Sequence, residues 1–240
     1  MKLFKWTNIR LVLMFSLVIF LFSFASNRNL GRKLTKSTVI FVGDDAPFVD
    51  QETVNKLLIE NRKDAQSIGK DKLDLNKLEK ALNAQEMIEK SDVFVSIDGV
   101  LKAVVKQKTP IARIFDGDSS FYIDYKGNRM PLSTNFTARV PLVSGEINKI
   151  NSENLGEFFR LIYNDAFLKK NIIGVQIMPN GSLKMLNRNF NYQIDYGGPV
   201  RMQAKFNNYK AFFQKVVLDS SLYKYKTIDL RFSQQVVCTK

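Results

Sequence analysis

IRLVLMFSLVIFLFSFA, residues 9–25, is the most apolar stretch of the chain. From residue 11 to residue 25 the only polar side chains are Ser16 and Ser23. This run of 15 residues is shorter than the roughly 20 that span a hydrocarbon core of about 30 Å. It precedes a long segment of ordinary globular composition, residues 38–240. We therefore expect the globular part to lie on the extracytoplasmic side of a membrane.

The N-terminal segment has two interpretations, which the residues leave open. As a cleaved signal peptide, it has a basic start at Lys2, Lys5 and Arg10 and a small-x-small cleavage site at residues 23–25. As a retained anchor, it has Arg10 to reach the headgroups and Trp6 as an interfacial aromatic residue. The apolar run is long for the hydrophobic region of a signal peptide, typically about 7–15 residues, and this favours the anchor.

Basic residues also follow the apolar segment. Arg28, Arg32 and Lys33 lie close after it, and we expect them to contact anionic lipid headgroups. Because similar numbers of basic residues flank both ends, the positive-inside rule gives little preference for either orientation. We place the N-terminus in the cytoplasm and predict a tail, a transmembrane helix and a linker over residues 1–8, 9–26 and 27–37.

The excess of positive charge is concentrated near the N-terminus. The formal net charge is +13, and the first 36 residues hold seven Lys and Arg without an acidic residue. The remaining residues carry 29 basic and 23 acidic side chains, which are interspersed. Nucleic-acid-binding proteins instead cluster basic and aromatic residues along one face. We therefore expect a membrane contact and no nucleic-acid partner.

The residue types that are missing limit the possible chemistry. The sequence contains no histidine, and Cys238 is its single cysteine. Catalysis through Ser-His-Asp or Cys-His, and zinc sites built from His and Cys, are therefore excluded. One thiol allows no internal disulfide, which suits a bacterial cell-envelope protein better than a small secreted disulfide scaffold. We expect no metal, no cofactor and no small-molecule substrate.

Residues 38–107 show the pattern strand, helix, helix, strand, strand. A β-branched run at residues 38–42 precedes two helices that Asp50 and Asp74 can cap. The next strand alternates, so its apolar members should be buried against the helices: Val93, Val95 and Ile97.

A hairpin and a break complete this pattern. Asp98-Gly99 predicts a type I′ turn, with positive φ at both residues, leading into a strand at residues 100–107. Pro110 cannot donate to a central ladder, so residues 108–110 mark a boundary.

The second half is richer in strands. Hairpins are predicted around Gly127 and at Asn180-Gly181, and a helix begins at Ser152. Residues 227–237 alternate in character and read as one closing strand. The predicted fold class is α+β, with a transmembrane helix, a β-α-α-β-β domain and a mixed β-sheet domain with flanking helices.

Acidic and aromatic clusters are better explained by structure than by chemistry. Asp116 and Asp118 start an EF-hand-like spacing, but Phe121 stands where Gly is needed and Gly127 where Glu is needed. The adjacent pair at residues 44–45 reads as a turn rather than an acid/base pair. Five aromatic residues read as helix-to-sheet core rather than a cofactor box: Phe158, Phe159, Tyr209, Phe212 and Phe213. We expect no catalytic residue.

The closing strand is the candidate binding site. A terminal strand often lies at a sheet edge, where free N–H and C=O groups can pair with a strand from another protein. A buried terminal strand that completes the sheet is the alternative, and the sequence pattern alone does not separate the two.

The order of segments and several motifs resemble the bacterial cell-division family FtsQ, called DivIB in some bacteria. The β-α-α-β-β unit is similar to a POTRA domain. The matching motifs are KTPIAR at 108–113, YIDYKG at 122–127, VPLVSG at 140–145 and IDLRF at 228–232. The resemblance covers essentially the whole chain and implies a retained anchor, a POTRA-like domain over residues 38–109 and a β domain over residues 110–240.

The resemblance implies a non-enzymatic divisome scaffold. Such a protein joins FtsB-like and FtsL-like partners at the division septum of the inner membrane, with its globular domains in the periplasm. There it helps recruit and regulate septal peptidoglycan synthesis. In the family, FtsB adds a strand beside the last strand of the β domain. Carried onto this sequence, the partner-binding residues are Ile228, Leu230, Arg231, Phe232, Ser233, Gln234 and Val236.

Two other classes stay open as alternatives. One is a POTRA-containing envelope assembly or secretion factor, which is disfavoured because no long series of amphipathic barrel strands follows. The other is an envelope hydrolase, which needs two carboxylates roughly 5–10 Å apart in a cleft. A folded structure with an open C-terminal edge would favour the scaffold.

Overall fold

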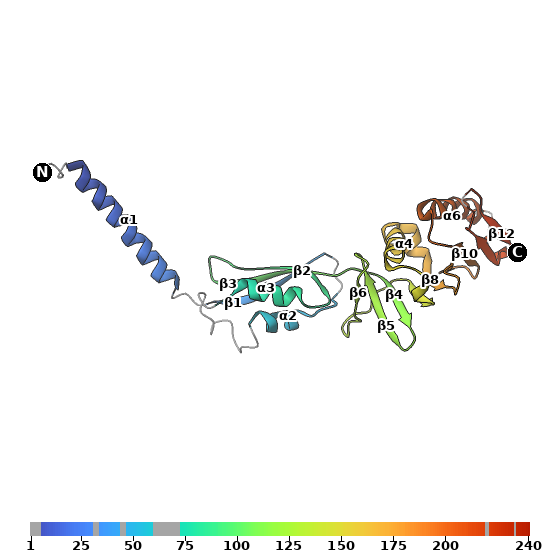
Figure 1. The fold of residues 1–240 in the computed structure, drawn as a ribbon, viewed down its shortest axis with the longest axis horizontal. Helices are drawn as coiled ribbons and strands as arrows, with labels where there is room; N and C mark the ends of the chain where they lie inside the picture. Colours follow the sequence, from blue (N-terminus) through green and yellow to red (C-terminus); the bar gives the residue numbers. More distant parts are fainter. Residues whose placement is uncertain (1–5, 31–33, 44–46, 60–72, 219–220, 233) are drawn as a thin grey trace. The chain divides into compact units, whose positions relative to one another are not determined.

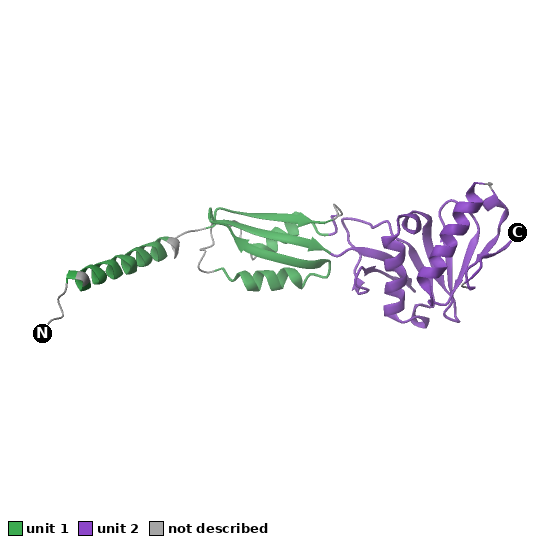
Figure 2. Cartoon of the chain, turned by 90° about the horizontal axis from the view of Figure 1, so that it is seen from above, with its two compact units in different colours: residues 1–45, 49–107 green, residues 46–48, 108–240 purple. Residues whose placement is uncertain are grey.

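The computed structural model describes residues 6–30, 34–43, 47–59, 73–218, 221–232 and 234–240. The chain divides into two compact units (Figure 2), one of residues 1–45 and 49–107 and the other of residues 46–48 and 108–240. Each unit has its own hydrophobic core. Helices and strands occur in both, so the predicted α+β fold class is confirmed.

The N-terminal helix α1 covers Trp6–Leu30, and its central Asn8–Arg28 stretch is long and apolar enough to cross a membrane. None of that stretch is buried against other parts of the protein. The Arg10 guanidinium lies 5.7 Å from the centre of the Trp6 ring, and Arg28 stands in the last turn. The helix therefore fits a single-pass membrane protein. The other predicted flanking residues, at positions 32 and 33, lie outside the described residues.

The first unit has the predicted order β-α-α-β-β (Figure 1). Its elements are β1 (Lys36–Val42), α2 (Gln51–Leu58), α3 (Leu75–Asn83), β2 (Ile88–Val95) and β3 (Val100–Gln107). The sheet order is β1-β3-β2, with β1 parallel and β2 antiparallel to β3. Both helices begin where an aspartate side chain accepts an otherwise unpaired amide: Asp50 from Thr53 N–H at 2.6 Å and Asp74 from Lys77 N–H at 3.0 Å.

The two helices pack on one face of this sheet. Val39, Ala103 and Val93 lie in register across the three strands and are buried. Leu58 of α2 and Leu82 of α3 belong to the same hydrophobic cluster. One sheet face therefore holds the core of this unit.

The hairpin after β2 differs from the prediction. Val93 is buried and Val95 packs against the core, but Ile97 is 91% exposed, so its predicted burial is wrong. The strand ends at Val95 and Ile97 lies in the turn, where alternation no longer fixes a side chain to one face. Gly99 has φ of 82°, whereas Asp98 has no positive φ, so the turn is not type I′. A hydrogen bond from Ser96 N to Val100 O closes a three-residue loop with glycine in the left-handed position.

The second unit contains a sheet of nine strands with the order β12-β11-β10-β9-β8-β7-β4-β5-β6. The strands are β4 (Pro110–Asp116), β5 (Ser119–Asp124), β6 (Arg129–Met130), β7 (Leu142–Gly145), β8 (Ile172–Ile177), β9 (Leu183–Asn187), β10 (Gln193–Gly197), β11 (Thr227–Asp229) and β12 (Val237–Thr239). The helices are α4 (Ser152–Asn164), α5 (Ala166–Asn171) and α6 (Met202–Val217), with short 3-10 turns η3 (Ile147–Lys149) and η4 (Ser221–Lys224).

Helices α4 and α6 cover the same face of this sheet (Figure 1). The rings of Phe158 on α4, Phe206 on α6 and Tyr196 on β10 lie 5.1–5.3 Å apart, centre to centre. Buried hydroxyls are also satisfied, because Tyr209 of α6 bonds to Tyr192 at 2.8 Å. The aromatic residues predicted as core are packed in this cluster. The opposite face, between β9 and β11, is free of these helices and carries polar side chains.

Candidate functional site

The C-terminal end of the sheet consists of two very short strands. β11 pairs in parallel with β10 on one side and antiparallel with β12 on the other. β12 is the last strand in the sheet order, and within the described residues it pairs with β11 alone. Its outer side thus presents the backbone groups of Val237–Thr239.

The prediction of one continuous edge strand over residues 228–237 is wrong. β11 ends at Asp229, and the chain loops before β12 begins at Val237. Two local interactions turn it: Leu230 is buried with its N–H bonded to Asp195 O at 2.8 Å, and the Asp229 side chain accepts the Arg231 N–H at 2.9 Å. The open edge lies at β12, and β11 is an interior strand.

The structure separates the predicted partner-binding residues into two groups. Ile228 and Leu230 are fully buried, so they belong to the core and face no partner, contrary to the prediction. Val236 is half-buried and packs against the same core. Arg231, Gln234 and Phe232 are exposed, and the side chain of Phe232 is 48% accessible. Position 233 lies outside the described residues.

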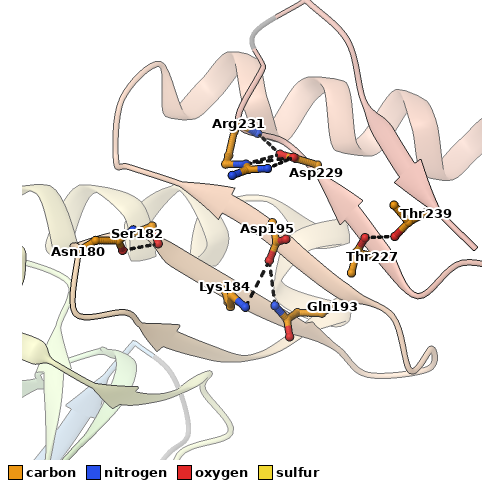
Figure 3. Close-up of polar contacts among 9 residues, drawn as sticks. All are labelled: Asn180, Ser182, Lys184, Gln193, Asp195, Thr227, Asp229, Arg231 and Thr239. Carbon is orange, nitrogen blue, oxygen red and sulfur yellow. Dashed lines mark hydrogen bonds and ion pairs between the residues drawn. The ribbon is translucent and has the colours of Figure 1, made fainter.

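A row of charged side chains runs across β9, β10 and β11 beside this edge (Figure 3). The strand register places Lys184 opposite Asp195, and Asp195 opposite Asp229. Lys184 Nζ lies 3.9 Å from Asp195 Oδ1, and Arg231 makes two-pronged contacts of 2.5–3.0 Å with the Asp229 carboxylate. The hydrogen bonds from Arg231 lower the pKa of Asp229 below its ordinary value. Asp229 is therefore ionised at neutral pH and holds the Arg231 guanidinium in place.

A cleft of about 400 Å³ opens next to this row. Its lining includes Lys184, Asp195 and Arg231 from the charged row, with Met178 and Leu183 as apolar members. Gly197 allows the close approach of one wall, because it has φ of 75° and an added Cβ would lie 2.8 Å from Arg231 Cγ.

A buried lysine holds the turn after β10. Lys205 of α6 is 3% exposed, and its Nζ donates to the carbonyl oxygens of Tyr196 and Gly198, both at 2.9 Å. Burial lowers the pKa of Lys205, and the nearby Asp229 raises it. This contact ties the helix to the end of β10, where the cleft begins.

The other candidate residues show no arrangement for catalysis or metal binding in the described part of the chain. No group of three or more Cys, Asp or Glu side chains there could hold a metal ion. Burial raises the pKa of the Cys238 thiol, which makes it a poorer nucleophile. Asp116 lies in a turn closed by Ser119 Oγ at 3.0 Å. Residues 44–45 lie outside the described residues. What the edge offers is backbone hydrogen-bonding groups, an exposed aromatic ring and charges of both signs.

An apolar N-terminal helix, a β-α-α-β-β unit and a mixed sheet with an open terminal strand define a single-span protein with a protein-binding edge. The family model described as FtsQ/DivIB, C-terminal related, matches residues 109–239, and the chain belongs to this family. No curated protein matches the chain. The family acts in cell division as a non-enzymatic scaffold within divisome complexes, and this chain has a cell-division role.

Sequence reasoning missed most of the charged row. Lys184 and Asp195 come from strands separated by a loop, and only the register between β9 and β10 brings them together. The alternation of Gln193 and Asp195 with buried Ile194 was the available signal, because it places both polar side chains on the face away from the helices.

Proposed function

We propose that this chain binds FtsB-like and FtsL-like partners at the division site, where it helps recruit and regulate septal peptidoglycan synthesis. The α1 helix anchors it in the inner membrane with the N-terminus in the cytoplasm and both compact units, including a POTRA-like first unit, in the periplasm. The chain acts as a scaffold and not as an enzyme.

The observation that carries this proposal is the position of β12 at the end of the sheet order, with pairing on one side only in the described chain. An edge strand can template an incoming strand through its free N–H and C=O groups. Because β12 has three residues, backbone pairing alone offers few hydrogen bonds. Side chains beside it must therefore add affinity and specificity.

Two neighbouring features are suited to that task. Phe232 precedes β12 and leaves about half of its ring surface exposed, which suits an aromatic anchor. Arg231 is held by Asp229 at the rim of the cleft, where it can orient an acidic group of a partner. Strand pairing sets the register, the ring contributes apolar contact, and the charged row discriminates among partners.

Proline substitutions at the edge test this proposal. Neighbouring residues of a strand point their N–H groups to opposite sides, so Val237→Pro and Cys238→Pro together remove one outward and one inward donor. We expect at least one of them to abolish co-purification of the full chain with the FtsB-like and FtsL-like proteins while circular dichroism stays that of the wild type.

Gln234→Pro is the matched control. Gln234 lies in the loop between β11 and β12, so the earlier expectation that proline there breaks a pairing strand is corrected, and binding should persist. Wild-type binding by both edge variants, each shown to be folded, would contradict strand addition at β12.

A further inference from the structure

A second cleft, of about 330 Å³, lies in the same unit at the start of β4, β7 and β8 and beside α4 and α5. Its lining contains no residue of β10, β11 or β12, so it is separate from the C-terminal edge. The walls include buried Ile162 and Ile172 together with Pro141 and Leu142. Leu142 is 49% exposed, which gives the cleft an accessible apolar surface.

Three cations surround this apolar surface: Arg139, Lys169 and Arg188. All three are exposed, and none forms an ion pair within the described part of the chain. Lys169 Nζ lies 3.8 Å from the centre of the Tyr163 ring, and Arg188 Nε donates to Lys170 O at 2.8 Å. These contacts hold two of the cations at the rim and leave their charge uncompensated.

No acidic residue lines the cleft among the described residues. Asp165, which caps the neighbouring helix α5, is already engaged by Lys210 Nζ at 2.6 Å. The charge of the whole unit has the same sign, because residues 108–240 contain 19 Lys and Arg against 10 Asp and Glu. Both the local rim and the wider field therefore attract an anionic group.

We propose that this cleft binds an acidic peptide segment of another protein, with an apolar side chain on the Leu142 surface and carboxylates at the three cations. The volume is at the lower end of the roughly 300–1,000 Å³ seen for ligand pockets, which suits a short side chain better than a long acyl chain. The chain would then have two independent contact sites, this cleft and the β12 edge.

Charge reversal with a defined probe tests this assignment. The probe is a fluorescein-labelled hexapeptide of alternating Glu and Leu, titrated by anisotropy against the full chain in neutral detergent. We expect Arg139→Glu combined with Lys169→Glu to weaken binding about tenfold or more, because two attractive charges become repulsive. The matched control combines Lys215→Glu with Lys224→Glu, two exposed lysines away from the cleft, and should bind like the wild type.

Several results would overturn the proposal. Equal weakening in the control would show a general charge effect, and equal wild-type affinity for a Gln-Leu hexapeptide would show that no acidic group is recognised. Displacement of the probe by dihexanoyl phosphatidylglycerol, but not by dihexanoyl phosphatidylcholine, would assign the cleft to a lipid. A dimer that the cleft variant converts to a monomer in light scattering would assign it to a second copy. Edge variants such as Val237→Pro should leave probe binding intact.

Discussion

Removing the Phe232 ring tests whether the exposed aromatic beside β12 contacts the partner. An aromatic side chain buries about 150–250 Å², so the 48% of Phe232 that stays accessible amounts to about 100 Å². At about 25 cal/mol per Å², complete cover by a partner contributes about 2.5 kcal/mol. Phe232→Ala should therefore weaken binding by up to about 60-fold.

The assay is a titration of the labelled FtsB-like partner with the full chain in detergent. Phe232 is not a member of the buried core, so the free energy of unfolding should change by no more than about 0.5 kcal/mol. Phe115→Ala is the matched control, because Phe115 is 39% exposed on β4, far from β12 in the sheet order. An unchanged affinity in Phe232→Ala, or an equal loss in the control, would refute the assignment.

Two further predictions concern the charged row and the buried lysine. Arg231→Ala should raise the pKa of Asp229 toward its ordinary 3.8, as measured by carboxyl NMR titration. Since the folded-state pKa is lowered, the stability lost in this variant should be present above about pH 4 and vanish as the pH falls through the folded pKa; a pH-independent loss would contradict it. Lys205→Met should leave the carbonyls of Tyr196 and Gly198 without their donor and lower the free energy of unfolding by about 1–3 kcal/mol in urea titration. Lys215→Met, at an exposed position, should change it by less than about 0.5 kcal/mol, and equal effects would contradict a special role for the buried ammonium.

Local signals predicted the parts of the fold that local chemistry determines. Asp50 and Asp74 cap helices where their side chains were expected to do so, because a cap depends on residues within one turn. The helix-to-sheet core followed from apolar spacing for the same reason. Ile97 was misplaced because alternation continued one residue pair beyond the point where β3 supplies a partner.

The binding edge was only partly predictable because strand pairing is not local. Residues 227–237 alternate as a strand would, yet Leu230 alternates because it enters the core and not because it pairs. The register between β10 and β11 brings Asp195 and Asp229 together from distant parts of the chain, and no spacing in the sequence encodes that register. Phe232 and Arg231 were recognisable through family resemblance, whereas Lys184 and Asp195 required the fold.

Amide hydrogen exchange on β12 tests the central claim most directly. The full chain should be compared free and saturated with its FtsB-like partner, with exchange followed over the C-terminal peptide that contains Val237–Thr239. Strand addition predicts that these amides become protected in the complex, while amides of β6 at the opposite edge exchange as before. Unchanged exchange over Val237–Thr239 in a saturated complex would contradict the account.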